Sequence, residues 1–124
     1  VYDTYADFSG RGYADSTRTI GVAAAGLTKP DLVAPGVNIL APDVYGSFLP
    51  VTGTSFATPI VSGAAALLME WGIVQGNDPF LYGEKIKAYL RKGARPLRGE
   101  REYPNDRVGY GKLCVAESFP NTID

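Results

Sequence analysis

The pattern of hydrophobic and polar positions divides the chain into one long apolar run and shorter, turn-rich segments around it. From Phe56 to Trp71 almost every position is apolar or small, and only Thr58, Ser62 and Glu70 are polar. A helix that is apolar on all sides is expected to be buried in a protein core. The pattern therefore predicts a core helix that begins near Ser55.

The segment before this run contains too many prolines to form a helix. Four prolines between residues 29 and 52 remove backbone donors and interrupt any helical hydrogen-bond ladder. Residues 38–41 and 48–51 are the best candidates for short strands within it. Residues 19–25, with the sequence TIGVAAA, form an earlier apolar run with strand character.

Two more helices are predicted after the apolar run. Asn77-Asp78-Pro79 combines an acceptor cap with a proline, which is a start signal for a helix that reaches about Arg91 and stops at Gly93. A last short helix is expected over residues 113–118. Strands mixed with helices in this way predict an α/β domain. The core stripe of the first of these helices would consist of Ile86, Tyr89 and Leu90.

The start of the core helix carries the most specific pattern in the chain. Gly53 lets the backbone turn sharply and approach a substrate closely, Thr54 and Ser55 are residue types that cap helices, and Pro59 is expected in the first turn. The N–H groups and positive dipole end of the helix would face negative charge beside the Ser55 hydroxyl, such as an acyl-transfer oxyanion. Ser55 is therefore a candidate nucleophile, although a bare Gly-Thr-Ser is far more often an ordinary cap.

Four segments, in order, resemble the subtilisin-like serine proteases. Gly53–Leu68 has the sequence GTSFATPIVSGAAALL and resembles the nucleophile segment of that family. Lys29–Ile39, KPDLVAPGVNI, resembles the proline-rich stretch that lies just upstream of the family's serine. Phe8–Gly12 resembles its Phe-Ser-Ser-x-Gly element, and Gly109–Gly111 with Ala116 resembles its closing Gly-Tyr-Gly segment.

The resemblance implies a fold and a place in a longer protein. The expected fold is α/β and partly subtilisin-like, with three layers and a mostly parallel sheet whose N-terminal strands are missing. The order of the subtilisin triad is Asp, His, Ser, so residues 1–124 would be the C-terminal portion of a subtilase catalytic domain. Residues 71–90 resemble the branch that contains the clostridial spore-germination subtilases. A secreted or spore-associated location is implied by resemblance only.

The resemblance also assigns roles to single residues. Ser55 would be catalytic and would attack the carbonyl of a peptide or protein substrate. Thr54 and Gly53 would form the oxyanion-binding turn, and Thr52 and Phe56 would lie in the substrate cleft. Phe56 stands where the family commonly has Met, and Thr52 where Ser or Asn is frequent. The chain has no histidine, so the base would come from upstream and this part of a serine endopeptidase should be inactive alone.

Two other functions stay open at the level of sequence. A pseudoprotease would keep the serine but lack its base or its acid. A noncatalytic interaction domain would use the basic residues between positions 85 and 107 to hold an acidic partner or a nucleic acid. Asp7 and Asp31 are weak candidates for the triad acid, because the acid of this family lies far upstream of the serine.

Composition limits the number of domains and the kinds of partner and cofactor that are expected. With 124 residues, 45% of them hydrophobic, the chain supports one globular domain with a core. Basic and acidic side chains alternate after residue 79, which indicates a solvated mixed-charge face rather than a nucleic-acid footprint. Cys114 is the single cysteine, and its apolar neighbours predict a buried packing residue. No calcium-loop pattern is present, so neither a metal nor another cofactor is expected.

Two expectations concern partners. No apolar run is judged long enough for a membrane span, so neither a membrane nor a nucleic acid is expected as a partner. If upstream strands are missing, apolar helix faces and an unpaired strand edge would be exposed. Self-association of the chain is therefore predicted.

Overall fold

A computed structural model describes residues 4–12 and 28–120 of the chain. The strand expected at residues 19–25 lies outside the described residues. Both of the other predicted strands and all three predicted helices are confirmed as elements, with corrections to their bounds. In chain order the elements are β1 (Ile39–Pro42), β2 (Phe48–Val51), α2 (Thr54–Met69), the π-helical turn η2 (Glu70–Val74), α3 (Gly83–Gly93) and α4 (Val115–Ser118).

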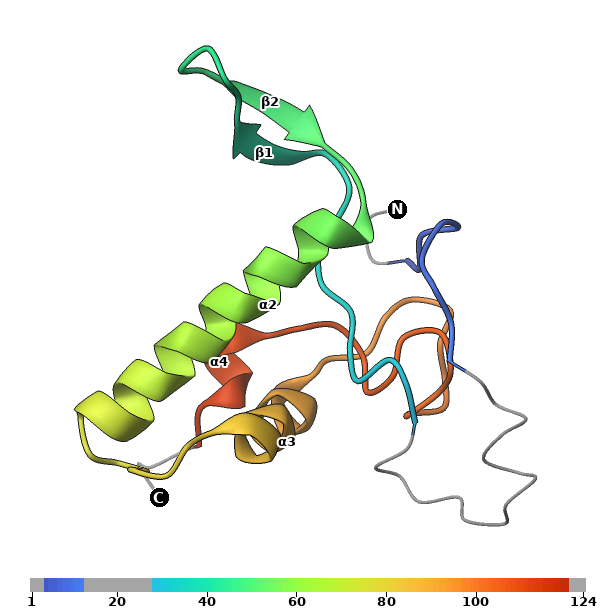
Figure 1. Cartoon of the computed structure of the whole chain (residues 1–124). Coiled ribbons are helices and arrows are strands. Elements are labelled where there is room, and N and C mark those ends of the chain that lie inside the picture. The colour runs from blue at the N-terminus through green and yellow to red at the C-terminus, as the bar shows by residue number, and fades with distance from the viewer. Residues whose placement is uncertain (1–3, 13–27, 121–124) are drawn as a thin grey trace.

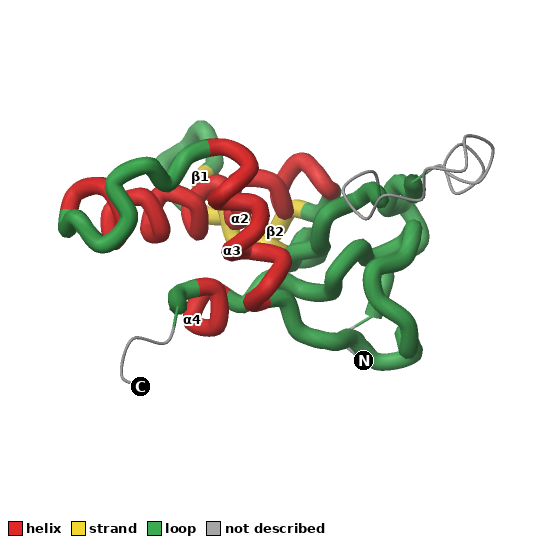
Figure 2. The backbone as a smooth tube through the Cα atoms, turned by 90° about the horizontal axis from the view of Figure 1, so that it is seen from below, coloured by secondary structure: helices red, strands yellow, loops and turns green. Residues whose placement is uncertain are grey.

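The helices and the loops occupy different parts of the molecule. The long helix α2 runs across the structure, with α3 and α4 on one side of it and the β1–β2 hairpin projecting from its N-terminal end (Figure 1). Seen from below, the helices gather at one end and the connecting loops at the other (Figure 2). The N-terminus of α2 is thus the point where hairpin, loops and helices meet.

The strands form an antiparallel hairpin. Ile39 pairs with Val51, and the ladder ends where Pro42 faces Phe48. Asp43 closes the turn, since its Oδ1 accepts hydrogen bonds from the N–H groups of residues 45 and 47, at 2.8 and 3.0 Å. The expected mostly parallel sheet is not found among residues 4–12 and 28–120, whose named strands form this hairpin alone.

The apolar core lies between the helices. Ala64 and Leu68 of α2 pack with Leu81 and with Leu90 of α3, and all four are buried. The ring of Trp71 meets the rings of Tyr89 and Phe119 at centroid distances of 6.2 and 5.8 Å. The predicted core stripe of α3 is confirmed, because Ile86 and Tyr89 pack against this cluster beside Leu90.

Helix α2 is much less covered than its all-round apolar sequence predicts. Leu67 is 55% exposed and Val74 is 75% exposed, whereas Ala64 and Leu68 are the α2 residues that are buried. The expectation of a fully buried helix is therefore wrong for the described residues. The expectation that no apolar run is long enough for a membrane span is wrong as well. Thr54–Val74 is 21 residues long and apolar enough to cross a membrane, by length and composition alone, a test that core helices of globular proteins also pass.

Helix α3 begins later than the sequence predicts. Asp78 does not cap a helix; its carboxylate accepts hydrogen bonds from Lys85 Nζ at 2.7 Å and from the Tyr89 hydroxyl at 2.6 Å. These two hydrogen bonds lower the pKa of Asp78. The bond between Tyr89 and Asp78 also raises the pKa of Tyr89. Leu81 inserts into the core against Gly72, which keeps residues 79–82 out of the helix. Burial of one leucine therefore overrides a local start signal.

The last helix is confirmed but short, with four residues from Val115 to Ser118. Gly93, at the end of α3, lies so close to it that a Cβ there would be 2.5 Å from the backbone nitrogen of Ser118. Cys114 precedes the helix as a free thiol that is only half-buried, which is more exposed than predicted.

Candidate active site

Ser55 is the second residue of α2 and its side chain is exposed at the helix N-terminus. Its hydroxyl makes no hydrogen bond to any of the described residues. The first N–H groups of a helix have no partner within it and lie at the positive end of the helix dipole. A negatively charged group beside Ser55 would therefore find free donors, which is the electrostatic setting that the sequence predicts.

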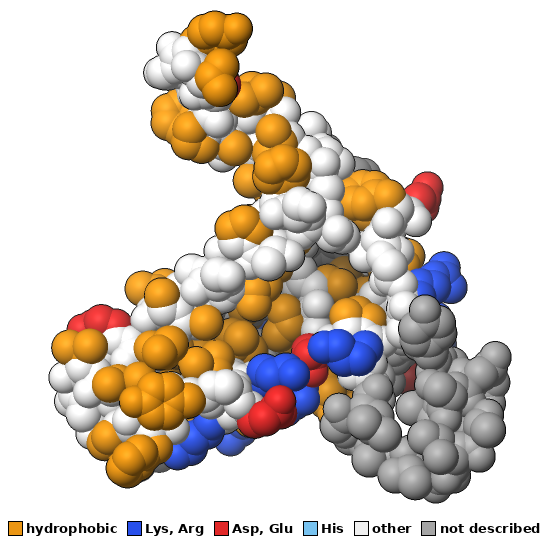
Figure 3. All heavy atoms as spheres, viewed as in Figure 1, with side chains coloured by type: hydrophobic (Ala, Val, Ile, Leu, Met, Phe, Trp, Pro, Cys, Tyr) orange, Lys and Arg blue, Asp and Glu red, His pale blue; other side chains and the backbone are white. Residues whose placement is uncertain are grey.

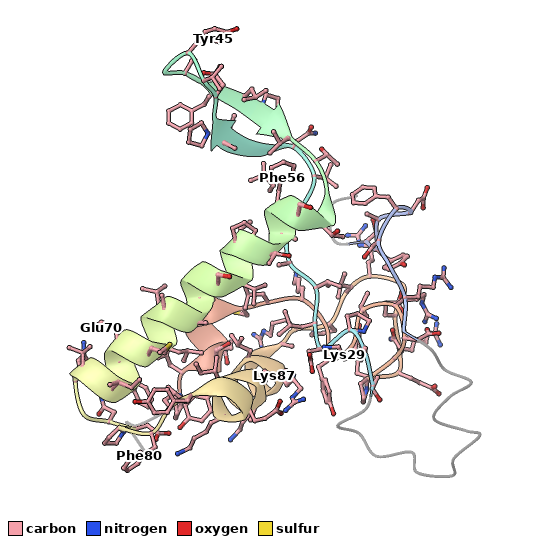
Figure 4. The ribbon with its side chains drawn as sticks, in the orientation of Figure 1. Lys29, Tyr45, Phe56, Glu70, Phe80 and Lys87 are labelled. Carbon is pink, nitrogen blue, oxygen red and sulfur yellow. The ribbon has the colours of Figure 1, made fainter. Side chains whose placement is uncertain are left out.

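Gly53 sets the direction in which the helix starts. Its φ of 152° and ψ of 159° belong to a region that residues with a Cβ avoid. The Phe56 N–H donates to the Gly53 carbonyl at 3.0 Å, which is the first hydrogen bond of the helix start. The Phe56 ring lies 3.5 Å from the position that a Gly53 Cβ would occupy, and Phe56 sits where α2 meets the hairpin (Figure 4). A side chain at residue 53 would thus disturb both the turn and this ring.

Thr54 and Pro59 shape the first two turns of α2. Thr54 is exposed, and its carbonyl accepts a hydrogen bond from the Thr58 hydroxyl at 3.0 Å. Pro59 is the sixth residue of the helix, so its expected place in the first turn is wrong. Because proline has no N–H, the Ser55 carbonyl lacks the usual donor four residues later. The backbone around Ser55 is therefore less tied into the helix than the rest of α2.

The turn before Ser55 is joined to the proline-rich segment. The Gly53 N–H donates to the Gly36 carbonyl at 2.7 Å, and the Asn38 N–H donates to the Thr52 hydroxyl oxygen at 3.0 Å. Thr52 is exposed. Gly36 and Asn38 were missed as site residues, because nothing local in the sequence says that they lie against the serine turn.

The four segments noted in the sequence meet in the loop region. The Gly12 N–H donates to the carbonyl of Asp106, at 2.9 Å, near the Gly-Tyr-Gly segment. Val33 donates to the Gly111 carbonyl at 2.9 Å and its own carbonyl accepts from Leu113 at 2.8 Å. Gly109 is packed so tightly that a Cβ there would lie 2.1 Å from the Pro30 carbonyl oxygen. These contacts join three of the segments to one another, and the hydrogen bond between Gly36 and Gly53 joins them to the fourth, which carries Ser55.

A pocket lies between these segments and one face of α2. Its volume is about 300 Å³. Thr54, Ala57, Thr58 and Val61 of α2 form one wall. The opposite wall comes from residues 9–10, 30 and 32–34, and the apolar side chains between α2 and the loops are visible in the space-filling view (Figure 3). Ser55 does not line this pocket.

Asp31 joins the loops to α3. Its carboxylate contacts Lys29 at 2.7 Å, Arg91 at 3.1 Å and Lys87 at 3.7 Å, and the two lysines lie beside each other in the stick view (Figure 4). Burial raises the pKa of Asp31, but the hydrogen bond from Lys29 and the charges of Lys29, Lys87 and Arg91 together bring that pKa below its usual value. Asp31 is thus engaged in structural ion pairs, and Asp7 lies exposed in the first loop.

The described residues offer no group of three or more His, Cys, Asp or Glu side chains that would hold a metal ion. The chemistry available at the helix start is therefore that of one exposed serine hydroxyl, free backbone donors and a glycine turn. A histidine base is not among them, since the chain contains no histidine.

Comparison with known proteins extends this picture. The profile of the Subtilase family matches residues 2–111. Serine protease AprX of Bacillus subtilis is 32% identical over 132 residues, an alignment that covers 95% of this chain and 26% of AprX. Membrane-bound transcription factor site-1 protease of Mus musculus is 32% identical over 117 residues, which cover 94% of this chain and 10% of that protein. The chain thus spans about a quarter or less of these relatives.

Solved structures agree with the sequence comparisons. The CspB protease of Clostridium perfringens superposes with a TM-score of 0.71 and 54% identity, over 74% of this chain and 19% of CspB. Prenylagaramide maturation protease PagA superposes with a TM-score of 0.56 and 39% identity, over 68% of this chain and 30% of PagA. The matched residues 2–111 include Ser55 and three complete segments of the four noted in the sequence, together with Gly109–Gly111. The chain therefore belongs to the Subtilase family.

Proposed function

We propose that this chain supplies the nucleophile of a subtilisin-like serine endopeptidase, and that the nucleophile is Ser55. The observation that carries the proposal is the exposed Ser55 hydroxyl at the N-terminus of α2, on a turn that only glycine accommodates at residue 53. Membership of the Subtilase family supports peptide or protein substrates.

In the proposed reaction Ser55 attacks the scissile carbonyl and forms an acyl-enzyme, which water then hydrolyses. Free N–H groups at the start of α2, on residues 54 and 55, would stabilise the oxyanion. Phe56 and Thr52 flank the serine turn, where Phe56 would border the substrate cleft. The histidine that takes the proton and the aspartate that orients it would come from residues outside this chain, since its 124 residues contain no histidine.

Two parts of the proposal concern the longer protein. Residues 1–124 would be the C-terminal portion of the catalytic domain, in line with the small share of each relative that they cover. The strands that would complete a parallel sheet would then pack on the exposed face of α2. The spore-germination branch stays a prediction that rests on residues 71–90.

The test is labelling with a fluorophosphonate probe. We compare the 124-residue chain with the whole polypeptide in which it occurs in the cell, called the native polypeptide below. The native polypeptide should be labelled at Ser55, as located by mass spectrometry, whereas the chain alone should be neither labelled nor active on a peptide ester. Ser55→Ala should abolish the label, and Ser62→Ala, on the same helix, should keep it.

Other outcomes would decide against the proposal. A label at another residue would show that Ser55 is not the nucleophile. A native polypeptide that takes up no label and cleaves no peptide would be a pseudoprotease or a noncatalytic module. Turnover by the chain alone that disappears in Ser55→Ala would mean that the chain contains its own base.

A further inference from the structure

Residues 36–38 lie directly against the turn that leads into Ser55, and we call them the brace. Two hydrogen bonds connect them to the turn: the Gly53 N–H donates to the Gly36 carbonyl at 2.7 Å, and the Asn38 N–H donates to Thr52 Oγ1 at 3.0 Å. The hairpin projects beyond these bonds, so they close it at its base (Figure 1). The brace is thus the segment that fixes the turn from the proline-rich side.

The contact at Gly36 leaves no room for a side chain. A Cβ there would lie 2.9 Å from the Gly53 carbonyl oxygen and 3.3 Å from the Ala57 Cβ. The Gly53 carbonyl accepts the Phe56 N–H at 3.0 Å, so a push on it moves the first hydrogen bond of α2. A displacement at Gly36 is therefore passed on to the backbone that carries Ser55.

The contact at Thr52 is a hydrogen bond in which the Thr52 hydroxyl oxygen is the acceptor. Asn38 adopts a φ of 55°, a left-handed conformation that Asn tolerates better than most residues. In this conformation its N–H points at Thr52 Oγ1. The Thr52 oxygen thereby serves as an internal acceptor, and its role in the substrate cleft stays a prediction from the sequence.

We propose that Gly36, Asn38 and Thr52 are positioning residues, which hold the turn so that Ser55 presents its hydroxyl in one place. The inference rests on the proposed role of Ser55 as nucleophile. Attack on a carbonyl requires reacting atoms about 3–3.5 Å apart, and a misplacement of about 1 Å can cost a hundredfold in rate. A brace that restricts the turn should thus raise kcat and have little influence on substrate binding.

The kinetic test uses matched variants of the native polypeptide. Thr52→Val keeps the side-chain shape but removes the acceptor, whereas Thr52→Ser keeps the acceptor. We expect Thr52→Val to lower kcat about tenfold with KM nearly unchanged, and Thr52→Ser to restore it. Gly36→Ala should lower kcat about a hundredfold. Ser47→Ala, which removes a hydroxyl from the hairpin turn, should leave both constants as they are.

A rise in KM at unchanged kcat in Thr52→Val would overturn the inference, because it would assign Thr52 to substrate binding. Equal activity of Thr52→Val and the wild type would also overturn it. Thermal unfolding of each variant identifies a Gly36→Ala protein that fails to fold, and in that case the Thr52 pair decides.

A second measurement is independent of catalysis. Amide hydrogen exchange at Asn38 and Gly53 should be slow in the wild type, faster in Thr52→Val and slow again in Thr52→Ser. If the exchange rates of these two amides are the same in Thr52→Val as in the wild type, the inference that the brace holds the turn is wrong, whatever the activity of the variant. If the wild type shows protected amides but no turnover, the brace contacts stand and it is the role of Ser55 as nucleophile that fails.

Discussion

The loop region and the helical region of this chain are held together by different interactions. Backbone hydrogen bonds and close glycine contacts join the loops, as between Val33 and Gly111 and between Gly36 and Gly53. Side-chain packing around Leu68 and Leu90 joins the helices. Helix α2 belongs to both, since Ser55 lies at the loop end and Leu68 at the helical end. The position of Ser55 should thus depend on the loop region, and the free energy of unfolding should depend mainly on the helical region.

The difference teaches which substitutions each end tolerates. A backbone hydrogen bond is directional and fixes atoms within a narrow range, so the loop region is suited to orient a reactive group. Burial of apolar area is non-directional and scales with the area removed from water. A change at the helical end should therefore alter the free energy of unfolding more than the geometry of Ser55.

The largest effect should come from Ser55→Ala in the native polypeptide. Its kcat/KM should fall by a factor on the order of 10⁶, the loss that follows removal of the serine of a Ser-His-Asp triad. The unfolding free energy should change by less than about 0.5 kcal/mol, because the side chain is exposed. Steady-state kinetics and urea unfolding measure the two. A large loss of unfolding free energy in Ser55→Ala would contradict the view that the loop end of α2 sets the geometry of Ser55 while the helical end sets stability.

At the helical end, adjacent leucines of α2 form a matched pair. Leu68 is 0% exposed and Leu67 is 55% exposed. Leu68→Ala should lower the unfolding free energy by about 2–5 kcal/mol, since it leaves a cavity in the core. Leu67→Ala should cost less than about 1 kcal/mol. Urea unfolding of the chain checks both, and similar losses for the two would mean that α2 packs differently.

The exposed apolar surface of α2 should drive association of the chain with itself. Leu67 and Val74 on α2–η2, with Leu40 and Phe48 on the hairpin, are between 55% and 75% exposed. Light scattering at micromolar concentration should show a mass that grows with concentration. Leu67→Glu should weaken association about tenfold. Ala88→Glu, which adds the same charge to α3, should not, and a monomer at all concentrations would contradict the prediction.

The smallest effect concerns the ion pairs that join the two regions. The pKa of Asp31 is below its usual value of 3.8, so its contribution to stability is fully present above pH 3.8 and is lost as the pH falls through the lower folded-state pKa. Asp31→Asn should therefore destabilise the chain by about 1 kcal/mol at pH 7, and by less at pH 3.

Asp7→Asn, at an exposed carboxylate, is the matched control for Asp31. It should leave the unfolding free energy nearly unchanged at both pH values. Urea unfolding at pH 7 and pH 3 measures the difference between the variants. An Asp31→Asn effect that is the same at both pH values would mean that the loss comes from something other than the charge.

Local patterns predicted the elements of the chain well, because each depends on near neighbours. The start of α2 at Thr54 follows from its glycine turn, and the strands follow from short apolar runs between prolines. The late start of α3 was not predictable, because it depends on the insertion of Leu81 against Gly72. The exposure of Leu67 was missed for a related reason. An apolar sequence indicates that the helix surface is suited to burial, but it does not say whether the residues that bury it belong to the same chain.

The site was predictable only in part for the same physical reason. Ser55 and Gly53 belong to one continuous motif, so the sequence alone is enough to name them as candidates. Gly36 and Asn38 touch the motif from 14 or more residues away, and this proximity arises from the hairpin between them. The role of Asp31 as an anchor for Lys87 and Arg91 likewise depends on contacts that the chain makes only when folded.

The closure of the hairpin at its base has a consequence for how such a protein diversifies and for how it is engineered. The chain leaves the brace at residue 38 and returns at residue 52, so whatever lies between begins and ends at fixed points. Lengthening a loop whose ends are already held costs little, about 0.6 kcal/mol for each doubling. Residues 44–50 of the hairpin are exposed, so insertions, epitope tags or new binding loops placed there should leave the position of Ser55 unchanged.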